Sequence, residues 1–489
     1  MKAMVDKLGD SCHPELDSGS NSNALKYVFL LGIIIFLSAC DGNTTPATEI
    51  PANPTFGEHI APIIHTNCTP CHRDDNIAPF RLVSYLDVKR KGGLIKSVTA
   101  IRFMPPWPAD ATYSHFIGER VLTENEIKTI GLWVDQGMPA GDTTKLPPLK
   151  DYDKPFINQK PDLVIAVDKA YLIKGNNADN FLVMRLPYQI AKDTFVKYIE
   201  FVPGNRKAVH HVNASLLSYD FEKKKNVFEG QRYVVEKWAN GDEGQRKLDK
   251  VSAIHKAIGI PNDDGSYPLL TYSVSNYLPG AEPYMYPDGI GGYRLRQKGA
   301  LYLNDMHYGP QTKDALDSSY FNIYFAPKPP ERPTGEFILG TLSTGGKAPV
   351  TPALIVPPNT TKSFKAELVI PNDISLLTVI PHMHLIGKSF KAYAIPPQGD
   401  TIRLIKINNW DFRWQYFYTF KTMVKIPAGS RIVAEGVYDN TGLNPNNPYS
   451  PPQEIREREG SMRTTDEMFQ LICVYVNYKQ GDENVSLEK

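Results

Sequence analysis

The chain has 489 residues, which by length alone is room for about three domains. Its 42% hydrophobic and 22% charged residues are typical of an ordinary globular protein. The formal net charge is +1 and the pI is about 7.6, so there is no basic surplus and we expect no nucleic-acid partner. Forty prolines and 35 glycines favour many short strands and turns over long helices.

An apolar run near the N-terminus, Tyr27–Ala39, fits the core of an export signal and is short for a membrane span. It ends in Leu-Ser-Ala followed by Cys40, which resembles the bacterial lipobox, where the cysteine becomes the lipidated first residue. We therefore expect a lipoprotein signal peptide at 1–40 and a polar tether at 41–53. The expected location is the bacterial cell envelope, with a lipid anchor in the membrane, on the periplasmic or cell-surface side. An ordinary signal peptide with a chance cysteine is the alternative.

A C-x-x-C-H motif follows the tether, formed by Cys68, Cys71 and His72. Two such cysteines can form thioethers with the two vinyl groups of a haem, and the adjacent histidine supplies the proximal iron ligand. The motif therefore predicts one covalent haem c. Met104, in a proline-rich loop, is the expected sixth ligand, because thioether ligation suits electron transfer. Met138 is the rival, and plain packing is the alternative for either methionine.

Three short helices are expected around this motif. A helical segment follows residue 54, and a second helix is expected around Asp87 to Ser97. Thr123-Glu-Asn-Glu126 reads as a capping box that opens a third helix, which Gly137 ends. This pattern predicts a small all-α cytochrome c domain at 54–142. Residues 143–160 are rich in proline and charge and read as a linker.

From Pro161 onward, short β-branched and aromatic runs alternate with turn residues, which favours antiparallel β-sandwiches. The clearest runs are Leu163–Val167, Phe195–Val202, Ala300–Leu303, Phe321–Phe325, Leu376–Ile380, Arg431–Tyr438 and Phe469–Val476. About 330 residues exceed one sandwich, so we expect two all-β domains, at 161–328 and 335–489. A charged insertion near 222–256 is either a partner site or a decorated loop. The charged run Glu454–Glu459 is either a solvated loop or part of a substrate entrance.

Histidines gather at three places in this β-rich part. His210 and His211 are adjacent, and His307 stands alone before Tyr-Gly. His382 and His384 are two residues apart, so on a strand they share one face and can chelate one ion. Imidazoles suit Cu, Zn, Fe and Ni, and a thioether ligand points to copper that cycles through Cu(I). Taken singly, a strand histidine or a lone methionine is more often structural.

The ordered set resembles the copper type II ascorbate-dependent monooxygenases, the family of peptidylglycine alpha-hydroxylating monooxygenase and dopamine beta-hydroxylase. The matching motifs are His-His, His-Tyr-Gly, His-x-His followed by Leu-x-Gly-Lys, and a late Asp-Glu-Met strand. The resemblance covers about residues 161–480 and implies two jelly-roll-like sandwiches with one copper each. It implies that His210, His211 and His307 hold an electron-storing copper. It also implies that the catalytic copper, which binds and activates O2, is held by His382, His384 and Met468.

The chain departs from the animal enzymes of that family in two ways. Those enzymes carry several disulfides. Of the five cysteines here, Cys12 lies in the expected signal peptide, three are assigned to lipid and haem, and only Cys473 remains, expected as a buried structural thiol. The animal enzymes also draw electrons from ascorbate, whereas this chain carries its own haem motif. The expected function is therefore an exported, haem-fused dicopper monooxygenase. It would hydroxylate a C–H bond of an unknown organic substrate with O2, using electrons from a periplasmic donor that pass through the haem.

Two other functions remain open from the sequence. One is a non-catalytic periplasmic protein that transfers electrons through copper and haem, with the sandwiches as a docking scaffold. The other is a zinc hydrolase that uses the histidine sites. The methionine in the second set argues against both, because neither function needs a soft ligand at an open site.

Overall fold

The computed structural model describes residues 49–151, 159–167, 169–236, 248–281, 285–458 and 464–488. The expected signal peptide, the lipobox Cys40 and residues 41–48 of the tether lie outside these ranges, so they stay predictions. Within the described ranges, no helix combines the length and the apolar character needed to cross a membrane.

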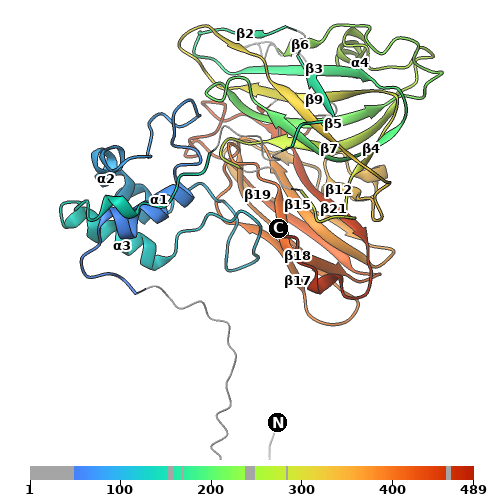
Figure 1. Cartoon of the computed structure of the whole chain (residues 1–489). Coiled ribbons are helices and arrows are strands. Elements are labelled where there is room, and N and C mark those ends of the chain that lie inside the picture. Colours follow the sequence, from blue (N-terminus) through green and yellow to red (C-terminus); the bar gives the residue numbers. More distant parts are fainter. Residues whose placement is uncertain are drawn as a thin grey trace, which may run out of the picture. The chain divides into compact units, whose positions relative to one another are not determined.

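Four helical segments pack together near the start of the described chain (Figure 1). They are η1 (Phe56–Ile60), α1 (Ala61–Asn67), α2 (Tyr85–Ala100) and α3 (Glu124–Asp135). Their shared core includes Ile64, Val88 and the fully buried Trp133. The capping box of α3 is confirmed, since the Thr123 hydroxyl accepts from the Glu126 N–H while the Glu126 carboxylate accepts from the Thr123 N–H. The three expected helices are therefore present, and α2 extends past the expected range at both ends.

The first group of strands forms two larger sheets and one small one. The four-stranded sheet has the order β1 (Leu163–Ala166), β11 (Tyr320–Ala326), β4 (Thr194–Val202), β8 (Tyr293–Leu295). The five-stranded sheet has the order β6 (Tyr233–Glu236), β3 (Asn180–Gln189), β9 (Lys298–Tyr308), β5 (Val209–Ser218), β7 (Leu269–Tyr277). The pair β10 (Ala315–Asp317) and β2 (Tyr171–Ile173) completes the group. One apolar cluster is shared by both larger sheets, as in a sandwich.

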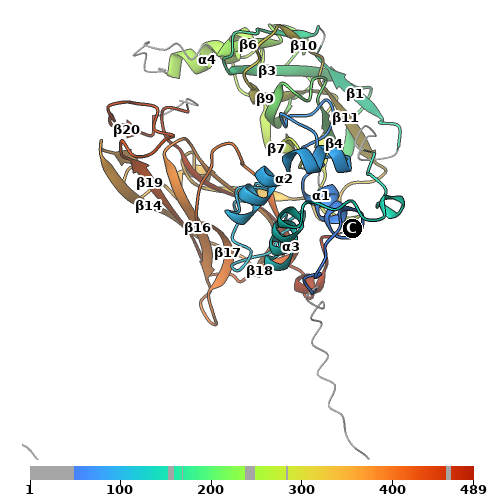
Figure 2. The same cartoon turned by 90° about the vertical axis from the view of Figure 1, so that its left-hand side faces the viewer.

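The second group of strands repeats this plan. One sheet has the order β12 (Gly335–Gly340), β21 (Phe469–Asn477), β15 (Ile374–Met383), β18 (Tyr418–Ile426). The other, visible as a layer in Figure 2, has the order β14 (Thr360–Val369), β19 (Arg431–Asn440), β16 (Gly387–Ile395), β17 (Ile402–Ile407). A short ribbon pairs β13 (Ile355–Val356) with β20 (Ile455–Arg456). Cys473 is fully buried in this core, which confirms the expected burial of its thiol.

The described chain is thus mostly β-sheet with few helices, and the predicted strands are all present. No sheet of the described residues mixes strands from before and after Gly335, which agrees with two sandwiches. The remaining short helices are α4 (Leu248–Ala257), η2 (Thr143–Lys145), η3 (Thr344–Gly346) and η4 (Asp482–Asn484).

The described part of the 222–256 segment packs onto the first sandwich. Arg185, fully buried on β3, donates to the carbonyl of Val227 (2.9 Å) and to the carbonyls of Glu229 and Ile258. Val227 and Ile258 are themselves buried. This part of the segment is therefore integrated into the fold, while residues 237–247 lie outside the described ranges.

One segment of the expected 54–142 domain packs elsewhere. Ala109 forms an isolated bridge with Ile407, and Phe116 forms one with Phe420. Both side chains lie in the apolar core of the second sandwich. The helical region is therefore not a separate packing unit, because the loop between α2 and α3 supplies residues to the core of a β-sandwich.

Candidate metal centres

His210, His211 and His307 come together between two neighbouring strands of the first sandwich. The antiparallel register of β5 and β9 places His211 opposite His307. A register shift between Val209 and His211 marks an irregularity at this end of β5. Neighbouring residues on a regular strand point to opposite faces, so such an irregularity lets two adjacent histidines face the same side.

The three rings converge through their Nδ1 atoms. The Nδ1 of His211 lies 3.2 Å from that of His210 and 3.4 Å from that of His307. One ligand nitrogen from each ring lies within 4.8 Å of the other two. Three imidazole nitrogens at this spacing fit one Cu or Zn ion.

A carboxylate contacts the third ligand, His307, through the ring nitrogen that faces away from the other two histidines. The Nε2 of His307 lies 2.7 Å from the Asp179 Oδ1, and this hydrogen bond holds the pKa of Asp179 below its usual range. Phe181 stacks on the same ring, with centroids 4.3 Å apart. An acidic partner of this kind orients a ligating imidazole and fixes which nitrogen faces the metal. The sequence carries no signal for Asp179, which lies 128 residues from His307.

His382, His384 and Met468 gather at the end of β15 and β21 in the second sandwich. The register pairs His382 with Gln470 and Met383 with Phe469. One more step along this register sets Met468 across from His384, and strand alternation places both on the face that carries His382. The rings of His382 and His384 have centroids 5.0 Å apart, and His384 and Met468 are each only 3% exposed.

The Nδ1 atoms of these two histidines are engaged by protein groups. The His384 Nδ1 lies 2.8 Å from the Asp466 carbonyl oxygen, and the His382 Nδ1 lies 2.5 Å from the Gln415 Oε1. A metal at this site would therefore be bound through Nε2. Two imidazoles and one thioether form a softer donor set than the three imidazoles of the first site.

Glu467 ties the two strands of this site together. Its carboxylate accepts the backbone N–H groups of His384 and Ile386, both at 2.8 Å. Complete burial raises the pKa of Glu467 to about 8. The sequence showed Glu467 only as part of the Asp-Glu-Met motif, and its role as the anchor of His384 appears only in the structure.

The C-x-x-C-H residues lie just after α1. The His72 Nδ1 donates to the Phe80 carbonyl (2.9 Å), which makes Nε2 the nitrogen that would bind an iron. Burial raises the pKa of the Cys68 thiol to about 12. Cys71 lies against a turn of the first sandwich, with its Sγ 3.7 Å from the Pro279 carbonyl. Two thiols and an oriented imidazole are the donor set that a c-type haem requires.

An apolar surface accompanies these donors. Leu94 on α2 is 48% exposed, and Ile101 and Phe103, just after the helix, are 75% and 51% exposed. The centroids of the Phe80 and His72 rings are 4.8 Å apart, and Lys91 of α2 lies over the Phe80 ring. The contacts through Phe80 and Lys91 place part of α2 near His72, and exposed apolar side chains on such a helix fit a large flat apolar group.

The two candidate methionines occupy different surroundings. The Met138 sulfur packs against Gly92 so closely that a Cβ there would lie 2.4 Å from it, and Met138 contacts the helical core. Met104 follows α2, and its backbone N–H donates to the Val98 carbonyl (3.2 Å). Packing thus accounts for Met138, and Met104 as the sixth ligand stays a prediction.

Comparison with known proteins gives one family match. Residues 348–447 match the model of the copper type II ascorbate-dependent monooxygenase C-terminal domain. No curated protein matches the chain. The solved structures that match include an allantoicase (11% identity, 61% of this chain and 86% of that one) and an infectious bursal disease virus Gx strain structure (9%, 65% and 81%). Both have a TM-score of 0.14, which is too low to carry an argument.

The matched stretch covers less than half of the chain and lies within the second sandwich. It contains His382 and His384 and ends before Met468. It therefore supports a relationship between this sandwich and the copper type II ascorbate-dependent monooxygenase family, and with it copper as the metal.

Proposed function

We propose that this protein is an exported, haem-fused dicopper monooxygenase that hydroxylates a C–H bond of an organic substrate with O2. The observation that carries the proposal is the pairing of two unlike sites in one chain. One site has three converging imidazoles, and the other has two imidazoles beside a buried thioether, in the sandwich that matches the family.

His210, His211 and His307 would hold the electron-storing copper, and His382, His384 and Met468 would hold the copper at which O2 reacts. When bound, copper supplies one-electron redox chemistry and reactivity towards O2. The thioether of Met468 favours Cu(I) at the second site. Asp179 and Glu467 keep the ligands in place, so little reorganisation is needed when the metal changes its charge.

Cys68 and Cys71 would attach the haem, with His72 and Met104 as its axial ligands. The hydrogen bond from His72 to Phe80 and the exposed apolar residues of α2 support this assignment. The haem would accept electrons from a periplasmic donor, and lipid on Cys40 would anchor the protein to a membrane of the cell envelope.

The test is a count of copper and haem per chain after export and copper loading, repeated for Met468→Leu. We expect two coppers and one haem in the parent protein. The variant should bind Cu(I) more weakly and lose substrate-dependent O2 uptake. Met383→Leu is the matched control, because it makes the same change on the opposite face of the neighbouring strand.

Unchanged Cu(I) affinity and O2 uptake in Met468→Leu would contradict the monooxygenase proposal. A haem-loaded protein with one copper or none would favour the electron-transfer alternative, since part of the histidine pattern would then be structural.

A further inference from the structure

A cavity of about 550 Å³ opens at one end of the second sandwich. Its walls come from the segment 340–355 and from 456–458 around β20, and Met468 forms part of its lining. The apolar part of the wall includes Leu342, Val350, Leu354 and Ile355. A cavity of this volume is in the range of small-molecule sites.

The cavity is adjacent to the second metal centre through Met468. β21 lies between β12 and β15, so the histidines flank the Met468 position from β15. On the other side, the Thr341 N–H donates to the Phe469 carbonyl (2.7 Å), and Thr341 lines the cavity. A molecule in the cavity would therefore contact the side chain that we assign to the O2-activating copper.

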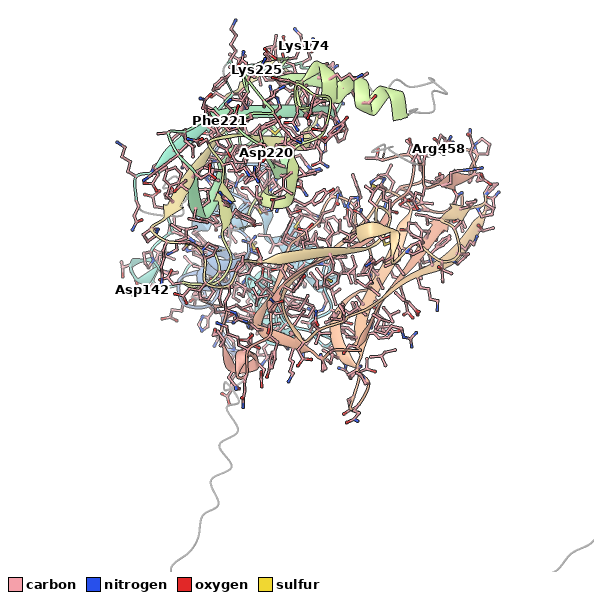
Figure 3. The ribbon with its side chains drawn as sticks, turned by 90° about the vertical axis from the view of Figure 1, so that its right-hand side faces the viewer. Asp142, Lys174, Asp220, Phe221, Lys225 and Arg458 are labelled. Atoms are coloured by element: carbon pink, nitrogen blue, oxygen red, sulfur yellow. The ribbon has the colours of Figure 1, made fainter. Side chains whose placement is uncertain are left out.

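Among the described residues, three ionisable side chains line the cavity: Arg456, Glu457 and Arg458. The Arg458 Nε lies 3.0 Å from the Asp466 Oδ1, and Arg456 forms an ion pair with Glu454. Arg458 lies at an outer edge of the strands (Figure 3), so this pair stands at the periphery. Each arginine thus has its own carboxylate. Burial raises the pKa of the Glu457 carboxyl, which disfavours its charged form, and Thr341 hydrogen-bonds to it. A charged ligand would therefore lose hydration in this cavity for little gain in ion pairing.

We propose that this cavity is the substrate site and that it takes an uncharged, mostly apolar organic molecule, presenting a C–H bond to the site of Met468. This inference rests on the proposed function. Burial of apolar surface against Leu342, Val350 and Leu354 would supply the binding free energy. The described part of the run Glu454–Glu459 then contributes to the entrance through Arg456, Glu457 and Arg458, while Glu459 lies outside the described residues.

The proposal is tested by calorimetric titration of the full chain, copper-loaded and copper-free, with three probes that share one tail: octan-1-ol, octanoate and octylammonium. We expect octan-1-ol to bind at one site per chain in both forms, and both charged probes to bind at least about tenfold more weakly. Equal or tighter binding of either charged probe, or no binding of octan-1-ol, would overturn the proposal.

Ala353→Trp locates the binding site. Ala353 is exposed on the cavity wall, so an indole there fills space without disturbing the core, and octan-1-ol should bind at least about tenfold more weakly. Ala428→Trp is the control, because Ala428 is also exposed and lies outside the cavity lining. Equal loss in both variants, or in neither, would overturn the assignment to this cavity.

These outcomes separate the two proposals. If octan-1-ol fails to bind while Met468→Leu still weakens Cu(I) binding, the cavity proposal fails and the proposed function stands. If octan-1-ol binds and Met468→Leu leaves Cu(I) binding unchanged, the link between the cavity and a copper site fails.

Discussion

The two histidine sites bring their ligands to one side of a sheet by opposite local geometries. In the first, a strand irregularity brings adjacent histidines to one side, and all three rings converge through Nδ1. In the second, regular strand alternation suffices, and the Nδ1 atoms of His382 and His384 are engaged by protein acceptors. The first is braced by the half-exposed Asp179 and the second by the fully buried Glu467. A spacing of two thus predicts a shared face directly, whereas an adjacent pair needs a departure from the regular strand.

The largest effect is expected when the first site loses its central ligand. His211→Ala deletes the Nδ1 that lies closest to both other ligands, so we expect metal analysis to fall from two coppers per chain to one. His115→Ala is the control, because this exposed histidine lies in the loop between α2 and α3 and its ring contacts the Glu119 carboxylate. Two coppers retained in His211→Ala would show that the three nitrogens do not form a metal site.

Glu467→Ala should produce the largest change in fold stability. It leaves the N–H groups of His384 and Ile386 buried without their acceptor, and we expect a loss of about 2–4 kcal/mol in the free energy of unfolding by urea titration. Glu467→Gln keeps one acceptor oxygen and should lose clearly less. Equal stability of the Ala variant and the parent protein would refute the anchoring role.

Asp179→Asn should act on the first site alone. Loss of the carboxylate behind His307 should weaken copper binding there by about ten- to a hundredfold, as competition with a copper chelator would measure. Binding at the second site should stay unchanged. Asp314→Asn, a change of an exposed carboxylate paired with Lys174, is the matched control. A similar loss at both sites would indicate a general effect on folding instead.

The smallest expected effect is a pH dependence of stability from Glu336 on β12. Burial raises the pKa of Glu336 to about 7 from a usual value of 4.5, and its Oε1 has no hydrogen-bond partner. The folded state therefore holds this proton more tightly than the unfolded state. Its contribution is complete below about pH 4.5 and is lost as the pH rises through 7. Thermal unfolding of Glu336→Gln from pH 5 to 8 should lack this decline, and a parallel decline in variant and parent would disprove its origin in Glu336.

Much of the architecture was predictable from local patterns. The capping box at Thr123 sets the start of α3. Runs of β-branched and aromatic residues between turns, such as Phe195–Val202, match observed strands. The domain bounds 54–142 stay a prediction, but local patterns gave no sign that Ala109 and Phe116 pack in the core of the second sandwich. Such a packing choice depends on contacts about 300 residues apart along the chain, which no local periodicity encodes.

Which side chains can act as ligands follows from the residues alone: the C-x-x-C-H motif, the His-x-His pair and the isolated Met468. Strand alternation alone places the His-x-His pair on one face, so that part of the second site needs no tertiary information. Three features appear only once the strands are packed: Asp179 hydrogen-bonds His307, Glu467 anchors His384, and a cavity adjoins Met468. The physical reason is that ligand identity belongs to single residues, whereas orientation, burial and cavities arise from strands that pair across long separations in the chain.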